Sequence, residues 1–190
     1  MSHTLLRDAR LYLALLEFDR DLARQARIAG CARCGGALHA ADYPRKPRGG
    51  PEQLPPGYDR RLSFCCRDCR RRTTPQSLRF LGRRVYLEAV FVLVSAMRHG
   101  LSARRVAELR RQVGVSRRTL ERWRRWWLTT FLSTPVWKAA RGRMAAPVAT
   151  SELPKSLLER FEGALRDQLE AALRLLQPLS IGWSPPGRGC

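Results

Sequence analysis

Two pairs of cysteines constrain this chain more than any other feature of its sequence. Cys31 and Cys34 are separated by two residues, and so are Cys66 and Cys69. This spacing lets two thiolates of one tight turn reach a single tetrahedral zinc ion, and two such turns complete its shell of four ligands. Because four thiolates leave no position for water, we expect structural Zn2+ in a small zinc ribbon rather than a catalytic metal.

The surroundings of the cysteines leave some alternatives open. The gap of 31 residues between the two pairs exceeds the roughly 15 to 20 that are usual. Prolines and glycines crowd residues 43–57, which predicts a long surface loop that absorbs the excess. Cys65 could replace its neighbour Cys66, although only Cys66 restores the two-residue spacing to Cys69, and we expect Cys65 to be a small buried side chain. His39 is an alternative fourth ligand.

The charge of the chain indicates a polyanionic partner. Its 190 residues carry a formal net charge of +20, and each phosphate that Lys or Arg neutralises releases condensed counterions. Nearly all the basic residues are Arg, as codon bias in a GC-rich genome would produce. That bias does not explain their placement, because residues 60–127 hold 19 basic and 4 acidic residues. We therefore expect this stretch to contact nucleic acid.

The sequence predicts neither a secretory signal nor a membrane span. Charged residues such as Arg7, Asp8 and Arg10 interrupt the N-terminal apolar positions. The longest apolar stretch elsewhere, residues 89–97, is too short to cross a bilayer. We expect no membrane partner and a cytoplasmic, nucleoid-associated location. In a reducing compartment, paired cysteines favour metal binding over disulfides.

Hydrophobic periodicity outlines a mainly α fold with a small zinc ribbon. A short strand over 61–65 precedes the second cysteine pair, and the other expected elements are helical. The predicted helices span 4–29 (ended by Gly30), 82–98, 103–112, 117–130, a short segment opened by Thr134 and Pro135, and 155–176. These elements divide the chain into an N-terminal amphipathic helix (1–30), the ribbon with its long loop (31–75), a helix-turn-helix (76–131), a C-terminal helical segment (132–177) and a mobile tail (178–190).

A helix-turn-helix is predicted between residues 82 and 130. Ser102 is a good N-cap for a helix with one apolar face. Residues 113–116 then form a short turn containing glycine, and Ser116 caps the next helix. The helix over 82–98 is apolar almost all round and would support the other two. Together they predict a three-helix, homeodomain-like unit flanked by N- and C-terminal helices.

The helix over 117–130 has two different faces. At about 100° per residue, three apolar residues share one face: Leu120, Trp123 and Trp127. Three arginines share the opposite face: Arg118, Arg122 and Arg125. We expect the tryptophans in the core rather than stacked on bases, and the arginines in a DNA groove. A solvated basic face is the alternative, but the few acids of the stretch cannot balance its arginines.

The order of these motifs resembles a known arrangement. The second cysteine pair continues into Arg70, Arg71 and Arg72, and a helix-turn-helix reading VSRRTLERW follows at 115–123. Over roughly residues 31–131 the chain is similar to the DNA-binding N-terminal part of insertion-sequence transposases and to the small accessory proteins of such elements. The resemblance implies binding to element ends or promoters, in transposition or its repression. The expected DNA contacts are Arg70, Arg71, Arg72, Arg117, Arg118, Thr119, Arg122 and Arg125.

The chain departs from that family after residue 131. A transposase nuclease core needs strands that carry separated metal-binding carboxylates, whereas the remaining residues look helical and their acids solvated. We therefore expect no catalytic activity. The apolar stripe of the helix over 155–176 is typical of a core face, and a homodimer through this helix is the alternative.

Three other functions compete with a mobile-element DNA-binding protein. A host transcription regulator would use the same physics. An RNA-binding zinc-ribbon protein of a ribonucleoprotein would also use an arginine-rich surface, although a basic helix fits the major groove of B-form DNA better. A protein adaptor that uses the neutral C-terminal helix would leave the basic stretch unexplained.

Overall fold

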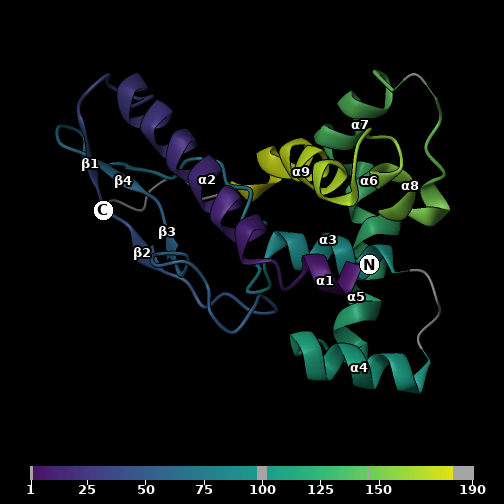
Figure 1. Cartoon of the computed structure of the whole chain (residues 1–190). Coiled ribbons are helices and arrows are strands. Elements are labelled where there is room, and N and C mark those ends of the chain that lie inside the picture. Colours follow the sequence, from purple (N-terminus) through teal and green to yellow (C-terminus); the bar gives the residue numbers. More distant parts are fainter. Residues whose placement is uncertain (1, 98–101, 145, 182–190) are drawn as a thin grey trace.

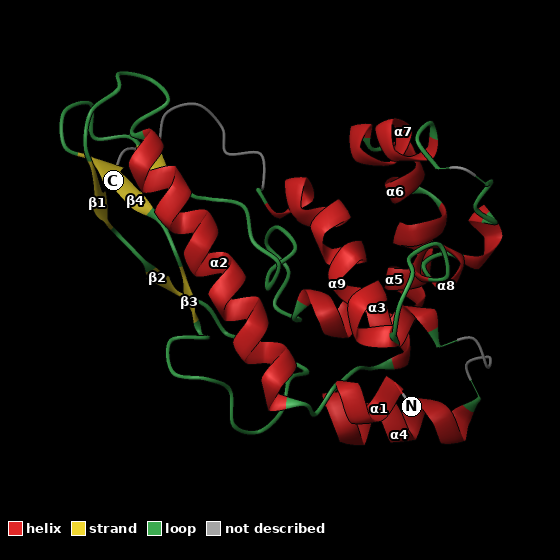
Figure 2. Ribbon diagram, turned by 45° about the horizontal axis from the view of Figure 1, so that its top comes forward, coloured by secondary structure: helices red, strands yellow, loops and turns green. Residues whose placement is uncertain are grey.

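The computed structural model describes residues 2–97, 102–144 and 146–181. The short strands lie at one end of the molecule and most helices at the other, and the long helix α2 extends along the strand-bearing end (Figures 1 and 2). The elements are α1 (Ser2–Leu5), α2 (Ala9–Ala29), β1 (Leu38–Ala40), β2 (Tyr43–Pro44), β3 (Arg60–Arg61), β4 (Phe64–Cys66), β5 (Arg72–Thr73), α3 (Glu88–Ala96), α4 (Ala103–Val113), α5 (Arg117–Leu128), α6 (Thr130–Ser133), α7 (Pro135–Arg141), η1 (Thr150–Glu152), α8 (Lys155–Leu158), α9 (Leu165–Leu176) and η2 (Gln177–Ser180). A mainly helical fold with small antiparallel sheets is confirmed.

The predicted N-terminal helix is divided in two. The Asp8 carboxylate accepts the backbone N–H of Arg10 at 2.9 Å, which caps α2 and separates it from α1. At the other end α2 stops at Gly30, as predicted, with a positive φ of 75° that favours glycine. The helix buries one stripe, which consists of Leu11, Tyr12, Leu15, Leu16, Asp19 and Ala23.

Two small antiparallel sheets replace the single predicted strand over 61–65. β4 lies between β1 and β5, and Leu38 of β1 faces Cys66 of β4. β2 pairs with β3, so the loop predicted over residues 43–57 is wrong at its first two positions, which form a strand. Pro44 has no backbone N–H to donate. It is tolerated there because β2 has only one neighbouring strand, so the edge without a donor can face away from β3.

The long loop between the cysteine pairs packs against the helical part instead of extending over the surface. A Cβ atom on Gly49 would lie 2.8 Å from Val90, and one on Gly50 would lie 2.8 Å from Leu87. The Leu87 N–H also donates to the carbonyl of Arg48 at 3.1 Å. The loop can approach α3 this closely only because both positions are glycine.

A buried ion pair joins α2 to the segment that follows β5. Arg79 and Asp19 are both at most 1% exposed, with Nε and Oδ2 2.7 Å apart. The other carboxylate oxygen accepts the N–H of Leu78 at 2.7 Å. The terminal nitrogens of Arg79 donate to the carbonyls of Tyr58 and Arg60, each at 2.9 Å. Burial of these charges is tolerated because both are paired and hydrogen-bonded.

Helices α3 and α5 pack against each other in the helical part, and α4 lies at its lower edge in Figure 1. The predicted helix over 82–98 begins only at Glu88, and α5 ends at Leu128 rather than at residue 130. Between α4 and α5, Gly114 has a φ of +67° and its carbonyl accepts the hydroxyl of Tyr86 at 2.8 Å. Val115 in the same turn is fully buried. The turn predicted at 113–116 is therefore packed against the segment that precedes α3.

The predicted helix over 155–176 is two helices, α8 and α9, separated by Gly163 at a φ of +90°. The apolar stripe of α9 is buried against α3, α7 and α8 of the same chain, through Leu169, Ala172, Leu173 and Leu176. The stripe therefore belongs to the core, which removes the reason for expecting a homodimer through this helix. The tail predicted from Pro178 instead begins in η2, where Ser180 Oγ accepts the N–H of Ser77 at 2.8 Å; residues 182–190 lie outside the described residues.

Candidate metal centre and nucleic-acid interface

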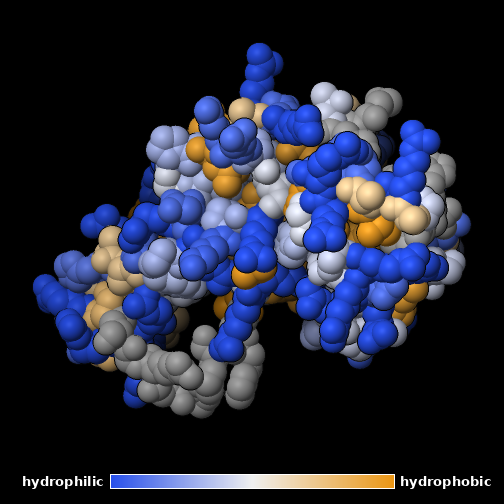
Figure 3. Space-filling model, turned by 90° about the horizontal axis from the view of Figure 1, so that it is seen from below, coloured by the Kyte–Doolittle hydropathy of each residue, from blue (hydrophilic) through white to orange (hydrophobic). Residues whose placement is uncertain are grey.

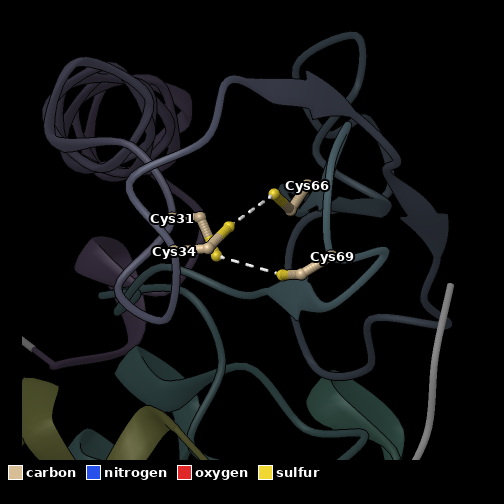
Figure 4. A group of neighbouring side chains, drawn as sticks. All are labelled: Cys31, Cys34, Cys66 and Cys69. Carbon is tan, nitrogen blue, oxygen red and sulfur yellow. Dashed lines mark hydrogen bonds between the residues drawn. The ribbon is translucent and has the colours of Figure 1, made fainter.

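The four predicted cysteines meet at one point. The sulfur atoms of Cys31 and Cys69 are 3.6 Å apart, and those of Cys34 and Cys66 are 3.5 Å apart. All four sulfurs lie within 4.8 Å of one another, and the side chains point toward a common centre (Figure 4). Zinc–sulfur bonds of about 2.3 Å in a tetrahedron separate the sulfurs by about 3.8 Å. The four residues therefore fit a structural Zn2+ ion.

The two cysteine turns have the same backbone geometry. The N–H of Cys31 donates to the carbonyl five residues later at 3.0 Å, and its own carbonyl accepts from Gly35 at 2.8 Å. In the second turn the N–H of Cys66 likewise donates to the carbonyl of Arg71 at 2.9 Å, and the Cys66 carbonyl accepts from Arg70 at 3.2 Å. Gly35 and Arg70 thus occupy equivalent positions, with φ of +70° and +55°. Arg70 adopts the left-handed conformation that the first turn assigns to glycine.

The two turns approach each other closely at Gly36. A Cβ atom on Gly36 would lie 2.2 Å from the Asp68 carboxylate and 3.1 Å from the sulfur of Cys66. A side chain there would displace the exposed Asp68 carboxylate and crowd the sulfur of Cys66. The glycine after the first pair therefore favours the close approach of the two turns.

Local hydrogen bonds prepare the thiols for metal binding. The backbone amides of Arg33 and Cys34 lower the pKa of Cys31 to about 6. The amide of Cys69 lowers the pKa of Cys66 in the same way. For Cys34 the Gly36 amide acts to lower the pKa, but the neighbouring thiols outweigh it and raise the pKa to about 12. Cys31 and Cys66 therefore ionise before Cys34, and a bound metal would displace the remaining protons.

Neither alternative ligand belongs to the centre. Among the described residues, the cluster that could hold a metal consists of the four cysteines alone. Cys65 and His39 face each other across β4 and β1, outside the cluster, and Cys65 is half-buried rather than fully buried. The spacing argument therefore selected the correct partner for Cys69. The acids of the C-terminal helices make local contacts; for example, Glu170 pairs with Arg166 at 3.3 Å.

The arginines that follow the second cysteine pair differ from one another. Arg70 and Arg71 are exposed. Arg72 lies on β5, and its Nη1 donates to the carbonyl of Ala41 at 2.7 Å and to Ser63 Oγ at 3.0 Å. Arg72 is exposed as well, but its guanidinium is engaged within the ribbon, whereas Arg70 and Arg71 are directed to solvent.

Helix α5 separates its two faces as the sequence predicts. The apolar face is buried, with Trp123 and Trp127 at most 1% exposed and Leu120 at 7%. The three arginines expected to face DNA, and the two beside them, are exposed, namely Arg117, Arg118, Arg122, Arg124 and Arg125.

The first turn of α5 is capped as predicted. Ser116 Oγ accepts the N–H of Thr119 at 3.4 Å and lies 3.1 Å from its hydroxyl. Thr119 is half-exposed, and its N–H and hydroxyl are engaged with the capping side chain of Ser116. On the same helix, Nε of Arg117 forms an ion pair with Oε1 of Glu121, four residues later, at 3.9 Å.

The metal centre and α5 lie at opposite ends of the molecule (Figures 1 and 2). Arg70 and Arg71, beside the centre, therefore do not extend the surface of α5. Seen from below, the face nearest α4 is mostly covered by hydrophilic side chains, with small hydrophobic areas between them (Figure 3). No helix of the described chain is long and apolar enough to span a bilayer.

Sequence reasoning missed one group of residues. Arg83 and Arg84 line a cleft together with Arg122 of α5 and the half-buried Trp126. Both arginines stand in the basic stretch, but only tertiary packing brings them to α5. Arg45 of the long loop is engaged with this segment, because its Nη2 donates to the carbonyls of Gly82 and Arg84, at 3.1 and 2.8 Å.

Comparison with protein-family models, with curated proteins and with solved structures finds no match for this chain. What stands of the expected resemblance is the four-cysteine centre and the mainly helical fold around it.

Proposed function

We propose that this protein is a non-catalytic DNA-binding protein that recognises duplex DNA through the helix-turn-helix formed by α4 and α5, with Zn2+ in the four-cysteine ribbon as a structural element. The observation that carries the proposal is the division of α5. Its tryptophans anchor it in the core, while Arg118, Arg122 and Arg125 are exposed along the opposite face.

A helix anchored in this way suits the major groove. An α-helix fits the groove of B-form DNA, where a guanidinium can make two hydrogen bonds to O6 and N7 of guanine. Aromatic packing keeps α5 from rotating, because the Phe91 ring of α3 contacts Trp123 edge-on and stacks on Trp127. The ring centroids are 5.2 and 5.3 Å apart, respectively. The direction of the helix face that carries the arginines is therefore set before DNA binds, which reduces the entropy lost on binding.

RNA is the alternative partner. A-form RNA has a deep, narrow major groove that side chains do not read, so an exposed basic helix favours duplex DNA. The role in a mobile element, as opposed to a host transcription regulator, rests on the motif resemblance alone. Both roles require the same DNA contacts.

Selection from a random duplex library, followed by competition with single-stranded RNA, tests the proposal. We expect enrichment of one duplex motif and weak competition by RNA. Efficient competition by RNA, or the absence of an enriched motif, would contradict sequence-specific DNA binding.

Variants of α5 sharpen this test. Arg118→Ala should weaken binding to the enriched motif by about 1 to 3 kcal/mol and binding to random duplex much less. Arg27→Ala is a matched control, because this exposed arginine in the last turn of α2 lies beside the ribbon and away from α5. Equal effects of the two substitutions on the enriched motif would argue against α5 as the reader.

A further inference from the structure

A cleft of about 600 Å³ lies beside α5. One wall is the segment 81–86, which carries Arg83 and Arg84, and the other includes Arg122 and Trp126 of α5. The cleft therefore connects the segment before α3 to the face of α5 that is proposed to approach DNA.

The cationic wall is held in place by internal contacts. The guanidinium carbon of Arg84 lies 4.6 Å from the centroid of the Phe91 ring and 5.0 Å from that of Trp126. From the other side, Arg45 Nη2 donates to the carbonyls of Gly82 and Arg84. The position of Arg84 is thus set by the fold rather than by a ligand.

The cleft gathers positive charge without acidic partners. Within the described residues, none of Arg83, Arg84 and Arg122 forms an ion pair with a carboxylate. Burial and the nearby charge of Arg122 lower the pKa of Arg84, while Glu88 acts in the opposite direction. An anion between these groups would relieve their mutual repulsion and accept their N–H donors.

The chemistry of the walls favours a phosphate over a base. One face of Trp126 is taken by Arg84, and Phe131 packs against the same ring at 5.5 Å between centroids. Thr134 is also engaged, because its hydroxyl donates to the carbonyl of Phe131 at 2.7 Å. The groups left for a ligand are guanidinium N–H donors, whose planar fork matches phosphate oxygens.

We propose that this cleft is a phosphate-binding site that holds a backbone phosphate of the duplex bound by α5, so that Arg122 contacts phosphate and Arg118 reads bases. The inference rests on the proposed DNA-binding function. It gives different roles to Arg118 and Arg122, which the sequence places together on one face in a DNA groove. Arg118 does not line the cleft.

The first test compares two substitutions on α5 that remove the same charge from exposed positions. Arg122→Gln should weaken the enriched motif and random duplex by the same factor, and reduce the log-log salt slope of binding by about one. Arg118→Gln should weaken the enriched motif at least about fivefold more than random duplex. Thermal unfolding of each variant should match that of the wild type, since both side chains are exposed.

The second test replaces single phosphates of the enriched duplex with neutral methylphosphonates. At one position the replacement should weaken binding of the wild type and of Arg118→Gln, yet have a smaller effect on Arg122→Gln and on Arg83→Gln, which have already lost one of the three guanidinium groups. If the replacement and Arg122→Gln act independently at every position, the phosphate site is refuted. The phosphate site would also be refuted if Arg122→Gln weakened binding to the enriched motif but not to random duplex. That result would leave the proposed function intact. A wild-type protein that binds no duplex would refute both.

Discussion

Glu88, the first residue of α3, provides a test of the core that can be worked out from the structure. Its side chain is fully buried, and neither carboxylate oxygen has a hydrogen-bond partner. Burial raises the pKa of Glu88 well above its ordinary value of 4.5, and Asp19 acts in the same direction, while Arg61 and Arg84 oppose it. We expect Glu88→Gln, which cannot ionise, to be more stable than the wild type at neutral pH.

The size of the effect follows from the difference in pKa between the two states. The unfolded chain ionises Glu88 as the pH passes 4.5, whereas the folded chain keeps it neutral to higher pH. Stability is therefore fully present below pH 4.5 and is lost as the pH rises toward the folded-state pKa. At about 1.36 kcal/mol per pH unit, the loss between pH 4.5 and 7 reaches at most about 3.4 kcal/mol.

The assay is urea unfolding, followed by tryptophan fluorescence at several pH values with zinc in excess. The quantity of interest is the stability of Glu88→Gln minus that of the wild type, since protonation of the zinc ligands affects both proteins. This difference should grow in favour of the variant from pH 4.5 to 7. Glu162→Gln, at an exposed position, controls for the lost negative charge. A difference for Glu88→Gln that does not change with pH would refute the reasoning.

Four further outcomes are expected. The purified protein should contain one zinc ion per chain by elemental analysis; Cys66→Ser should lose it and Cys65→Ser should keep it, and the reverse would mean that the wrong neighbour was chosen. Arg70→Gly should raise the free energy of unfolding by about 1 kcal/mol in urea titration, because it relieves the left-handed backbone at a φ of +55°; destabilisation would count against this. Trp123→Ala should lower the free energy of unfolding by about 3 to 5 kcal/mol, because the missing side chain leaves a cavity in the core. A fall in melting temperature too small for that loss would place the side chain outside the core. Arg79→Met should lower the free energy of unfolding by about 3 to 5 kcal/mol, because it leaves the buried Asp19 carboxylate unpaired. A free energy of unfolding close to that of the wild type would argue against the ion pair.

Much of the metal centre could be predicted from the sequence because its signals are local. Each cysteine turn is closed by hydrogen bonds between residues four or five apart, so the spacing of Cys66 and Cys69 already identifies them as partners. Helix ends such as the cap at Ser116 also depend on a few neighbouring residues. The local pattern even indicated which face of α5 is buried.

The helix boundaries were predicted less well where tertiary contacts compete with helix propensity. The residues just before Glu88 were expected to be helical, yet Leu87 pairs with the long loop through Arg48 and is fully buried in an extended conformation. The break at Gly163 divides a helix that apolar periodicity alone had extended through it. In both cases a contact or a single backbone angle outweighed the periodic pattern.

By itself the sequence determined the metal ligands, the caps and the two faces of α5, because each depends on spacing within a few residues. Only the tertiary structure decided which arginines serve the fold and which are free for a partner. Arg79 pairs with Asp19, sixty residues away, and Arg72 and Arg45 likewise donate to distant carbonyls. Arg118 is exposed and has no such bond within the described part of the chain. The reason is physical: every guanidinium carries the same charge and donors, so its role depends on which acceptors the folded chain brings within hydrogen-bond distance.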